Sequence, residues 1–257
     1  MLKTLKKLLA GRVREETTRP RINYPANTFS DIFVIGDVHG CLAELLDAER
    51  RIQALTDSAE SNKLIVMVGD YVDRGPNSSG VLDHLLAPPP TGFQRICLCG
   101  NHDDAFHQFA ISPRFEREWL NFGGEATLRS YGVDAAFHLK VDPRGRSLLE
   151  AARAQIPDEH VAFLKDAPVA LSIGKFVFVH AGMAPGIPLE DQADADLMWI
   201  REPFLTDGPM ADIIVVHGHT PSEKIVFGKR RIGLDTAAYI TGRLDVLRIN
   251  REGYAIL

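Results

Sequence analysis

The chain has 257 residues, 45% of them apolar, with a formal net charge of -5 and a pI near 6.0. This length and apolar share suit one globular domain. The acidic balance gives no overall basic field, so the charge does not indicate nonspecific binding to nucleic acid. No stretch approaches the roughly 18 consecutive apolar residues that a membrane-spanning helix requires. We therefore expect a soluble protein with no nucleic-acid partner and no transmembrane segment.

Three cysteines occur, Cys41, Cys97 and Cys99. An odd count, with two cysteines on alternate positions of one apolar run, does not describe a disulfide framework. This usage fits a reducing compartment. We therefore expect a cytoplasmic protein in which the cysteines are small core residues.

The first residues, MLKTLKKLLAGRVR, place leucines and lysines at the spacing of an amphipathic helix. The stretch is too weakly apolar for a secretory signal. We expect a basic N-terminal arm over residues 1–28, followed by a single domain over residues 29–257. The arm could dock weakly on an anionic membrane surface or a partner, although a frayed terminus is the commoner explanation for such a segment.

Five short apolar runs after residue 30 each end in a polar cluster: DIFVIGD, KLIVMVGD, RICLCGN, KFVFVH and DIIVVHGH. Runs of this kind indicate buried strands. Segments with helical spacing at residues 41–55 and 79–87 separate the first three runs, which predicts a β-α-β-α-β order with right-handed crossovers.

The stretch over residues 104–165 has a different texture, with helical segments and two aromatic-rich parts. We expect it to form a helical cap inserted into the domain. Its aromatic and glycine residues could line a peptide groove or a base pocket, or simply pack within the cap: Trp119, Phe122, Gly123, Gly124 and Tyr131.

Strand patterns resume after the cap, and the sequence around Thr241 and Gly242 predicts a closing antiparallel hairpin. The fold class expected from the whole pattern is α/β (α+β). In this fold two packed mixed β-sheets are flanked by helices.

Asp, His and Asn residues concentrate in five fragments beside the predicted strands: GDVHG (36–40), GDYVDRG (69–75), GNHD (100–103), HAG (180–182) and HGHT (217–220). Loops at strand ends are where active sites are usually built. Glycines beside the polar residues allow sharp turns that a side chain would obstruct. Six side chains form a candidate set of metal ligands: Asp37, His39, Asp70, Asn101, His180 and His219.

The residue types in this set indicate two cations. A carboxylate can bridge two cations, so Asp70 is the natural bridge. Mixed oxygen and imidazole ligands suit manganese, iron or zinc better than calcium. Two ions about 3.5–4 Å apart would hold a bridging hydroxide that attacks phosphorus in line, without a covalent phosphoenzyme. Within HGHT, His219 is preferred as the ligand over His217.

His102 follows the ligand Asn101 and could protonate the leaving oxygen. Asp73 could accept a hydrogen bond from the other ring nitrogen and keep the ring protonated near neutral pH. Arg74 offers a planar fork for two phosphate oxygens, and Arg201 is a second candidate. Arg74, Arg201 and Asn101 form the expected phosphate-binding set.

Each of these residues, taken alone, would more often be a turn, a helix cap or a satisfied core group. Chance does not readily place GDxHG, GDxxDRG and GNHD in this order at near-equal spacing, so the set is interpreted as a site. Four histidines lack such neighbours and receive no functional role: His84, His107, His138 and His160.

Over about residues 31–249 these motifs resemble the phosphoprotein phosphatase family of calcineurin-like metallophosphoesterases, in its bacterial and phage branch. The resemblance implies the two-sheet fold of that family and a dinuclear centre commonly supplied with manganese. It also divides the ligands between the ions. One ion would have Asp37, His39 and Asp70, and the other would have Asp70, Asn101, His180 and His219.

By the same pattern His102 and Asp73 are the acid pair and Arg74 is the phosphate clamp. The segment LMWIREPF (197–204) is similar to the Trp-x-Arg segment of the bacterial and phage protein phosphatases, which nominates Arg201. One departure is that the third motif reads GNHDD, whereas the eukaryotic protein phosphatases carry Glu after the histidine. Asp103 is therefore uninformative about the substrate.

The resemblance implies a serine/threonine protein phosphatase, which would act on phosphorylated proteins or small phosphoesters. A symmetrical bis(5'-nucleosyl)-tetraphosphatase, which hydrolyses diadenosine tetraphosphate, shares the same motifs and is the alternative. A catalytically silent binding module is the third hypothesis. It requires at least one broken ligand, and all six are intact.

Overall fold

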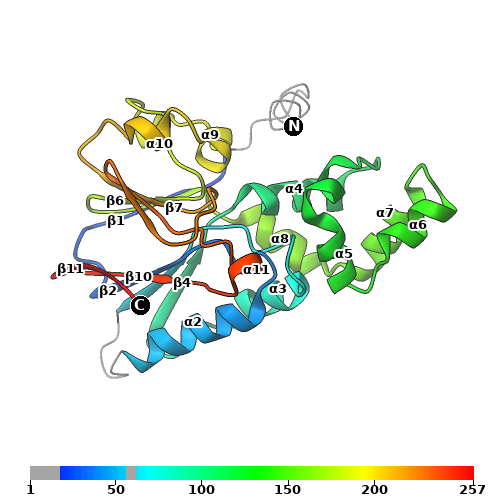
Figure 1. The fold of residues 1–257 in the computed structure, drawn as a ribbon, viewed down its shortest axis with the longest axis horizontal. Helices are drawn as coiled ribbons and strands as arrows, with labels where there is room; N and C mark the ends of the chain where they lie inside the picture. The colour runs from blue at the N-terminus through cyan, green and yellow to red at the C-terminus, as the bar shows by residue number, and fades with distance from the viewer. Residues whose placement is uncertain (1–17, 56–61) are drawn as a thin grey trace.

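Two β-sheets form the centre of the molecule in the computed structural model, which describes residues 18–55 and 62–257 (Figure 1). The strands are β1 (Arg21–Tyr24), β2 (Asp31–Ile35), β3 (Lys63–Met67), β4 (Phe93–Cys97), β5 (Ala170–Ile173), β6 (Phe176–Val179), β7 (Ile214–His217), β8 (Val226–Gly228), β9 (Arg231–Gly233), β10 (Val246–Asn250) and β11 (Gly253–Ile256). One sheet has the order β1-β5-β6-β7-β9-β8 and the other β11-β10-β2-β3-β4. Both sheets mix parallel and antiparallel pairs.

The strands β2, β3 and β4 run parallel and are joined by α2 (Leu42–Ala54) and α3 (Ser78–Leu86). Every residue of β2 and β3 is buried, as expected for parallel strands covered on both faces. The predicted β-α-β-α-β order is confirmed. Its consequence is that the carboxyl ends of the three strands lie at one edge of the sheet.

Among the described residues, three clusters of apolar side chains fill the spaces between adjacent layers. Between the sheets, Val34 and Val66 of one sheet pack with Phe178 and Val216 of the other. The opposite face of the five-stranded sheet packs against α2, α3 and the helices that follow β4. The outer face of the six-stranded sheet packs against α9 (Asp194–Trp199) and α10 (Phe204–Asp207). The predicted fold class, two packed mixed sheets flanked by helices, is confirmed.

Helices occupy the stretch between β4 and β5, where the sequence predicts a cap over residues 104–165. They are α4 (Asn101–Ile111), a π-helical turn (Leu120–Gly124), α5 (Glu125–Ser130), α6 (Ala135–Val141), α7 (Arg146–Gln155) and α8 (Asp158–Asp166). In Figure 1 they form the mainly green group beside the sheets. A short 3-10 helix (Leu189–Asp191) precedes α9.

The expected end of the N-terminal arm at residue 28 is wrong, because β1 pairs in parallel with β5 at the sheet edge. Just before β1, the Arg19 guanidinium donates to Leu164 O (2.8 Å) and Ala167 O (3.1 Å), and to Asp104 Oδ1 on α4 (3.0 Å). This segment therefore belongs to the domain. Residues 1–17, which carry the leucine and lysine pattern, lie outside the described residues.

The hairpin expected around Thr241 and Gly242 is also wrong. The chain instead crosses between the sheets, from β9 in one to β10 in the other, through α11 (Ala238–Thr241). In the part of the chain that the structure describes, the antiparallel hairpins are β5–β6, β8–β9 and β10–β11. Strand periodicity shows which residues share a face but not which sheet a strand joins, so the crossing has no sequence signal.

Among the described residues, no helix is long and apolar enough to cross a membrane. The three cysteines are free. Burial raises the pKa of the Cys41 thiol to about 11 and that of Cys97 to about 12. These thiols are therefore protonated at neutral pH and poorly reactive.

A buried ion pair ties α2 to β4 and generates a stability prediction. Glu49 is 3% exposed and accepts from Arg95 Nη2 (2.9 Å), while His84 Nε2 lies 2.8 Å from its other oxygen. Glu49→Leu should lower the free energy of unfolding by about 3–5 kcal/mol, because the Arg95 guanidinium would stay buried without its counter-charge. Urea denaturation measures this change.

The matched control is Asp47→Ala on the exposed face of the same helix, where Asp47 pairs with Arg50 and Arg51. Exposed helix pairs contribute little, so this variant should unfold at nearly the wild-type urea concentration. Equal shifts in the two variants would contradict the prediction.

Candidate metal centre and active site

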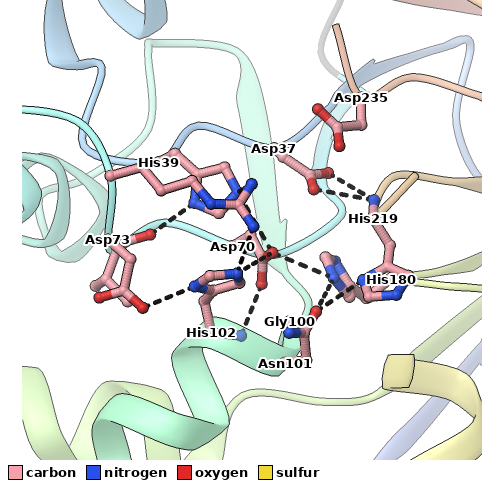
Figure 2. A network of polar contacts seen from close by, with 12 residues as sticks. Asp37, His39, Asp70, Asp73, Gly100, Asn101, His102, His180, His219 and Asp235 are labelled. Carbon is pink, nitrogen blue, oxygen red and sulfur yellow. Dashed lines mark hydrogen bonds and ion pairs between the residues drawn. The ribbon is translucent and has the colours of Figure 1, made fainter. Parts of the chain in front are cut away.

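The five polar motifs meet where strands of both sheets end (Figure 2). Asp37, Asp70 and Asn101 follow β2, β3 and β4, respectively, while His180 directly follows β6 and His219 follows β7. Because β2, β3 and β4 are parallel, as are β6 and β7, the side chains that follow them are brought to one place. The exposed fraction of each of these side chains is at most 7%.

Backbone strain concentrates at this place. Five site residues other than glycine have left-handed φ angles: His39 (45°), Asp70 (56°), Asp73 (71°), Arg74 (67°) and His219 (65°). This region is sparsely populated by such residues and costs free energy that the surrounding structure must supply.

Two glycines of the motifs, Gly100 and Gly218, allow the turns to pack against each other. A Cβ atom on Gly100 would overlap the Asp70 carboxylate, and one on Gly218 would overlap that of Asp37. The glycines in the motifs are therefore required by close contact with the carboxylates, in addition to backbone freedom.

A single carboxylate oxygen, Asp70 Oδ2, lies between two imidazoles. It is 3.5 Å from His39 Nε2 and 3.4 Å from His180 Nε2. Each ring donates its Nδ1 proton to a main-chain carbonyl, at 2.8 Å to Val72 O and 3.0 Å to Val68 O. These bonds fix the tautomer and leave both Nε2 lone pairs directed toward the carboxylate, as metal-bound histidines require.

Asn101 brings together a second group of acceptors. Its Oδ1 lies 2.8 Å from both His180 Nε2 and His219 Nδ1, while its Nδ2 has no hydrogen-bond partner among the described residues. Burial lowers the pKa of His180 to about 4, so the ring is neutral and its Nε2 carries no proton. At the contact between His180 Nε2 and Asn101 Oδ1, nitrogen and oxygen lone pairs therefore face each other, an arrangement that a cation between them would stabilise.

The carboxylates also require positive charge. Burial, followed by the negative charges of Asp235 and Asp70, raises the pKa of Asp37 well above its ordinary value. Burial likewise raises the pKa of Asp70. Divalent cations would offset the loss of hydration and the repulsion between carboxylates that cause these shifts.

Two groups of potential ligand atoms, each within 4.8 Å of one another, share Asp70: one joins it to His39 and His102, the other to Asp37 and His180. The donor set of carboxylate, amide and imidazole groups fits two borderline divalent ions. Asp70 is the residue common to both groups, and its bridging role between two ions stays a prediction. The assignment of each remaining ligand to one ion stays a prediction.

His102 and Asp73 form a close pair at the side of the centre. His102 Nδ1 lies 2.7 Å from Asp73 Oδ2, and Arg74 Nη2 lies 2.9 Å from His102 Nε2. Burial, followed by the charge of Arg74, lowers the pKa of His102 well below its ordinary value, while burial raises that of Asp73 to about 7. Burial, and after it the charge of Arg74, therefore oppose the expected protonation of His102 near neutral pH, and this role stays a prediction.

The two candidate phosphate-binding arginines lie on different sides of the centre. Arg74 Nη1 is 2.9 Å from His39 Nε2, and the guanidinium lies 5.0 Å from the centroid of the Tyr239 ring. Arg201 donates from Nη2 to His219 O at 3.3 Å. Both guanidinium groups are half-buried and positively charged, as an anion site requires.

Residues 30–248 match the family of calcineurin-like phosphoesterases. The chain belongs to this family. Salmonella typhimurium serine/threonine-protein phosphatase 1 is 26% identical to this phosphoesterase over 245 residues, covering 92% of this chain and 99% of the relative. The asymmetrical bis(5'-nucleosyl)-tetraphosphatase PrpE of Geobacillus thermodenitrificans is 24% identical over 238 residues, covering 84% and 89%.

A crystal structure assigned as a candidate diadenosine tetraphosphatase has a TM-score of 0.63 and 21% identity, covering 93% of this chain and 97% of that one. This similarity supports the fold. Family membership confirms that the phosphoesterase is a metal-dependent phosphoester hydrolase. The names of these relatives give two different activities, a protein phosphatase and a bis(5'-nucleosyl)-tetraphosphatase, so the comparisons do not identify the substrate.

The remaining histidines of this phosphoesterase lie elsewhere or have other partners. His217 Nδ1 lies 3.0 Å from Gly218 O, and its ring packs on Phe204. His84 pairs with Glu49, and His160 lies between Tyr131 and Asp83. These contacts give them structural explanations.

Several residues of the phosphoesterase site have no clear sequence signal. Asp103 is fully buried and accepts the backbone N–H groups of Asp70 (2.7 Å), Tyr71 (2.9 Å) and Gly100 (2.9 Å), so it holds the second and third motifs together. Asp235 is 2% exposed, and its Oδ2 has no hydrogen-bond partner among the described residues. The contacts of Asp103 with Asp70 and Tyr71 span 33 and 32 residues, so no local pattern records them.

Asp70→Asn should lower the metal content of the phosphoesterase from about two ions per chain to one or fewer, because an amide is a poor bridge between two cations. Elemental analysis after gel filtration in Mn²⁺ measures the content. Asp73→Asn is the control and should keep the wild-type content. Normal metal content in the Asp70 variant would contradict the bridging assignment.

Proposed function

We propose that this phosphoesterase is a serine/threonine protein phosphatase that hydrolyses phosphomonoesters. The observation that carries the proposal is the pair of half-buried guanidinium groups, Arg74 and Arg201, on different sides of the metal centre. A phosphomonoester is a dianion near neutral pH, so two arginines beside two cations match its charge. The near-complete mutual coverage with the Salmonella protein phosphatase supports the same substrate class.

The proposed ligands are Asp37, His39, Asp70, Asn101, His180 and His219. Two divalent ions held there, Mn²⁺ with Fe or Zn as alternatives, would supply Lewis acidity and activate water for attack on phosphorus.

The proton for the leaving oxygen is proposed to come from His102 Nε2, which faces the centre while Asp73 holds Nδ1. Arg74 contacts this nitrogen at 2.9 Å. If Arg74 turns to bind phosphate, the nitrogen is released, and the nearby dianion favours the protonated ring. Substrate binding would thereby prepare the acid.

A second candidate function is hydrolysis of bis(5'-nucleosyl) tetraphosphates. The specific support is the coverage of the asymmetrical enzyme, at 84% of this chain and 89% of the relative. Half-buried aromatic rings near the centre, Phe122, Trp199 and Tyr239, are the groups on which a base could stack. Symmetrical enzymes, the alternative considered from the sequence, align over 60% of this chain and 44% of their own length.

A cytoplasmic location is proposed from cysteine usage, since all three cysteines are free. Docking through the N-terminal arm stays a prediction, because residues 1–17 are not described.

Phosphate release from a phosphothreonine peptide should depend on Mn²⁺, cease with chelator, and exceed hydrolysis of diadenosine tetraphosphate under the same conditions. Malachite-green detection and nucleotide chromatography measure the two reactions. Faster cleavage of the dinucleotide would reject the protein phosphatase in favour of the second candidate. Inactivity on both substrates would reject both proposals.

His102→Asn should retain metal and lose about 10²–10⁴-fold in kcat on a phosphothreonine peptide, because the alkoxide leaving group needs a proton. The loss on p-nitrophenyl phosphate should be much smaller, because p-nitrophenolate leaves without protonation. Equal losses on the two substrates would exclude His102 as the acid.

A further inference from the structure

We propose that residues 119–127 of the helical insertion position the proton donor His102. This role rests on the proposed acid function of His102. The segment contacts the site through three side chains and one carbonyl, which we call the acid cradle: Trp119, Phe122, Thr127 and the carbonyl of Gly123.

The first contact fixes the Asp73 oxygen that holds His102. Trp119 Nε1 donates to Asp73 Oδ2 at 3.0 Å, and His102 Nδ1 lies 2.7 Å from the same oxygen. The indole is 6% exposed and stacks against Phe106 with ring centroids 5.3 Å apart. A Cβ atom on Gly124 would overlap it, so the indole is closely confined. The oxygen therefore has two fixed donors and one orientation.

The second contact fixes the other end of Asp73. Thr127 Oγ1 donates to Asp73 Oδ1 at 2.7 Å and accepts the Asp73 backbone N–H at 2.8 Å. One hydroxyl therefore holds both the carboxylate and the main chain of a residue with a left-handed φ of 71°. The carboxylate is fully buried, so its orientation is set by these donors rather than by water.

The third contact fixes the plane of the acid itself. The Phe122 ring stacks on the His102 imidazole with a centroid distance of 3.9 Å and an interplanar angle of 5°. Phe122 also neighbours Trp199, with ring centroids 5.7 Å apart and an interplanar angle of 21°. Stacking limits tilt of the imidazole while Asp73 limits its rotation, so Nε2 is directed at one point.

The backbone of the same turn reaches the phosphate clamp. Gly123 O accepts the Arg74 backbone N–H at 3.3 Å, within a π-helical turn where Gly123 has a φ of 121°. A Cβ atom at Gly123 would lie 3.1 Å from Arg74 Cγ, so glycine permits this approach.

Packing alone does not account for these contacts. Among the residues that the structure describes, the side-chain donors to the Asp73 carboxylate are His102, Trp119 and Thr127, so the insertion supplies those outside the acid pair. The sequence-based alternative that Trp119 and Tyr131 line a groove is wrong, because they are only 6% and 8% exposed. The insertion therefore acts on His102 through Asp73 and through stacking.

The test uses Thr127→Val, which removes a donor to Asp73 at nearly constant side-chain volume, and Trp119→Phe, which removes the indole donor but keeps a smaller aromatic ring. Each holoenzyme is assayed with a phosphothreonine peptide and with p-nitrophenyl phosphate at saturating substrate, and its metal content is measured. We expect each variant to lose about 10-fold in kcat on the peptide, a part of the roughly 10²–10⁴-fold that acid catalysis contributes, and to change little on p-nitrophenyl phosphate. Metal content should stay at the wild-type value.

Tyr131→Phe is the matched control, because it removes a buried hydroxyl in the same insertion that pairs with His160 and does not touch Asp73. It should leave the ratio of the two kcat values unchanged. In a His102→Asn background, Trp119→Phe should have no further effect on kcat, because its action passes through the acid.

The outcomes separate this inference from the proposed function. If His102→Asn shows the leaving-group dependence and neither cradle variant does, positioning by the insertion is overturned while the acid assignment stands. If His102→Asn itself lacks the dependence, both are overturned. A Tyr131→Phe variant with the same selective loss on the peptide would also overturn the inference, since general loosening of the insertion would then explain the result.

Discussion

The site depends on one constraint, which is that hydrogen-bond acceptor atoms lie close together around Asp70. Its Oδ2 faces two unprotonated imidazole nitrogens, and one of these, on His180, also faces the amide oxygen of Asn101. In a buried site such acceptors repel, and the cost is high because little water screens them. Cations convert the repulsion into coordination. Folding of the strand ends and binding of metal are therefore linked, because each supplies what the other lacks.

Hydrogen bonds to backbone N–H groups offset the free-energy cost of holding these side chains close together. Asp70 adopts a left-handed conformation, and its N–H is held by the Asp103 carboxylate, which also accepts from Tyr71 and Gly100. One buried side chain thus satisfies three main-chain donors in two motifs. From the sequence, Asp103 was uninformative about the substrate. Its contacts in the structure show instead that it holds the shape of the turn. Strain in one loop is offset by hydrogen bonds from the next, as strained active-site residues require.

Much of the site could be predicted because its signals are local. Each motif follows a buried strand, and parallel strands bring their carboxyl ends together whatever lies between them. The contacts of Asp73 with Trp119 and Thr127 could not be predicted, because they span 46 and 54 residues and depend on how the insertion folds. The charge of His102 depends on burial and on Arg74, neither of which a motif records. The crossing between β9 and β10 was missed for a similar reason, since sheet membership is a long-range property.

The contacts of Arg19 determine how a pulling force on the segment before β1 would be transmitted to the rest of the fold. Its guanidinium joins carbonyls at the end of α8 to Asp104, which lies in the first turn of the helix that begins with Asn101 and His102. Force applied through residue 18 would therefore load that helix as well as β1, which begins at Arg21. The opposite end behaves differently, because the Leu257 N–H bonds to Val246 O at the five-stranded sheet. Pulling on residue 18 or on Leu257 would thus load different elements of the fold: α4 and β1 in the first case and the five-stranded sheet in the second.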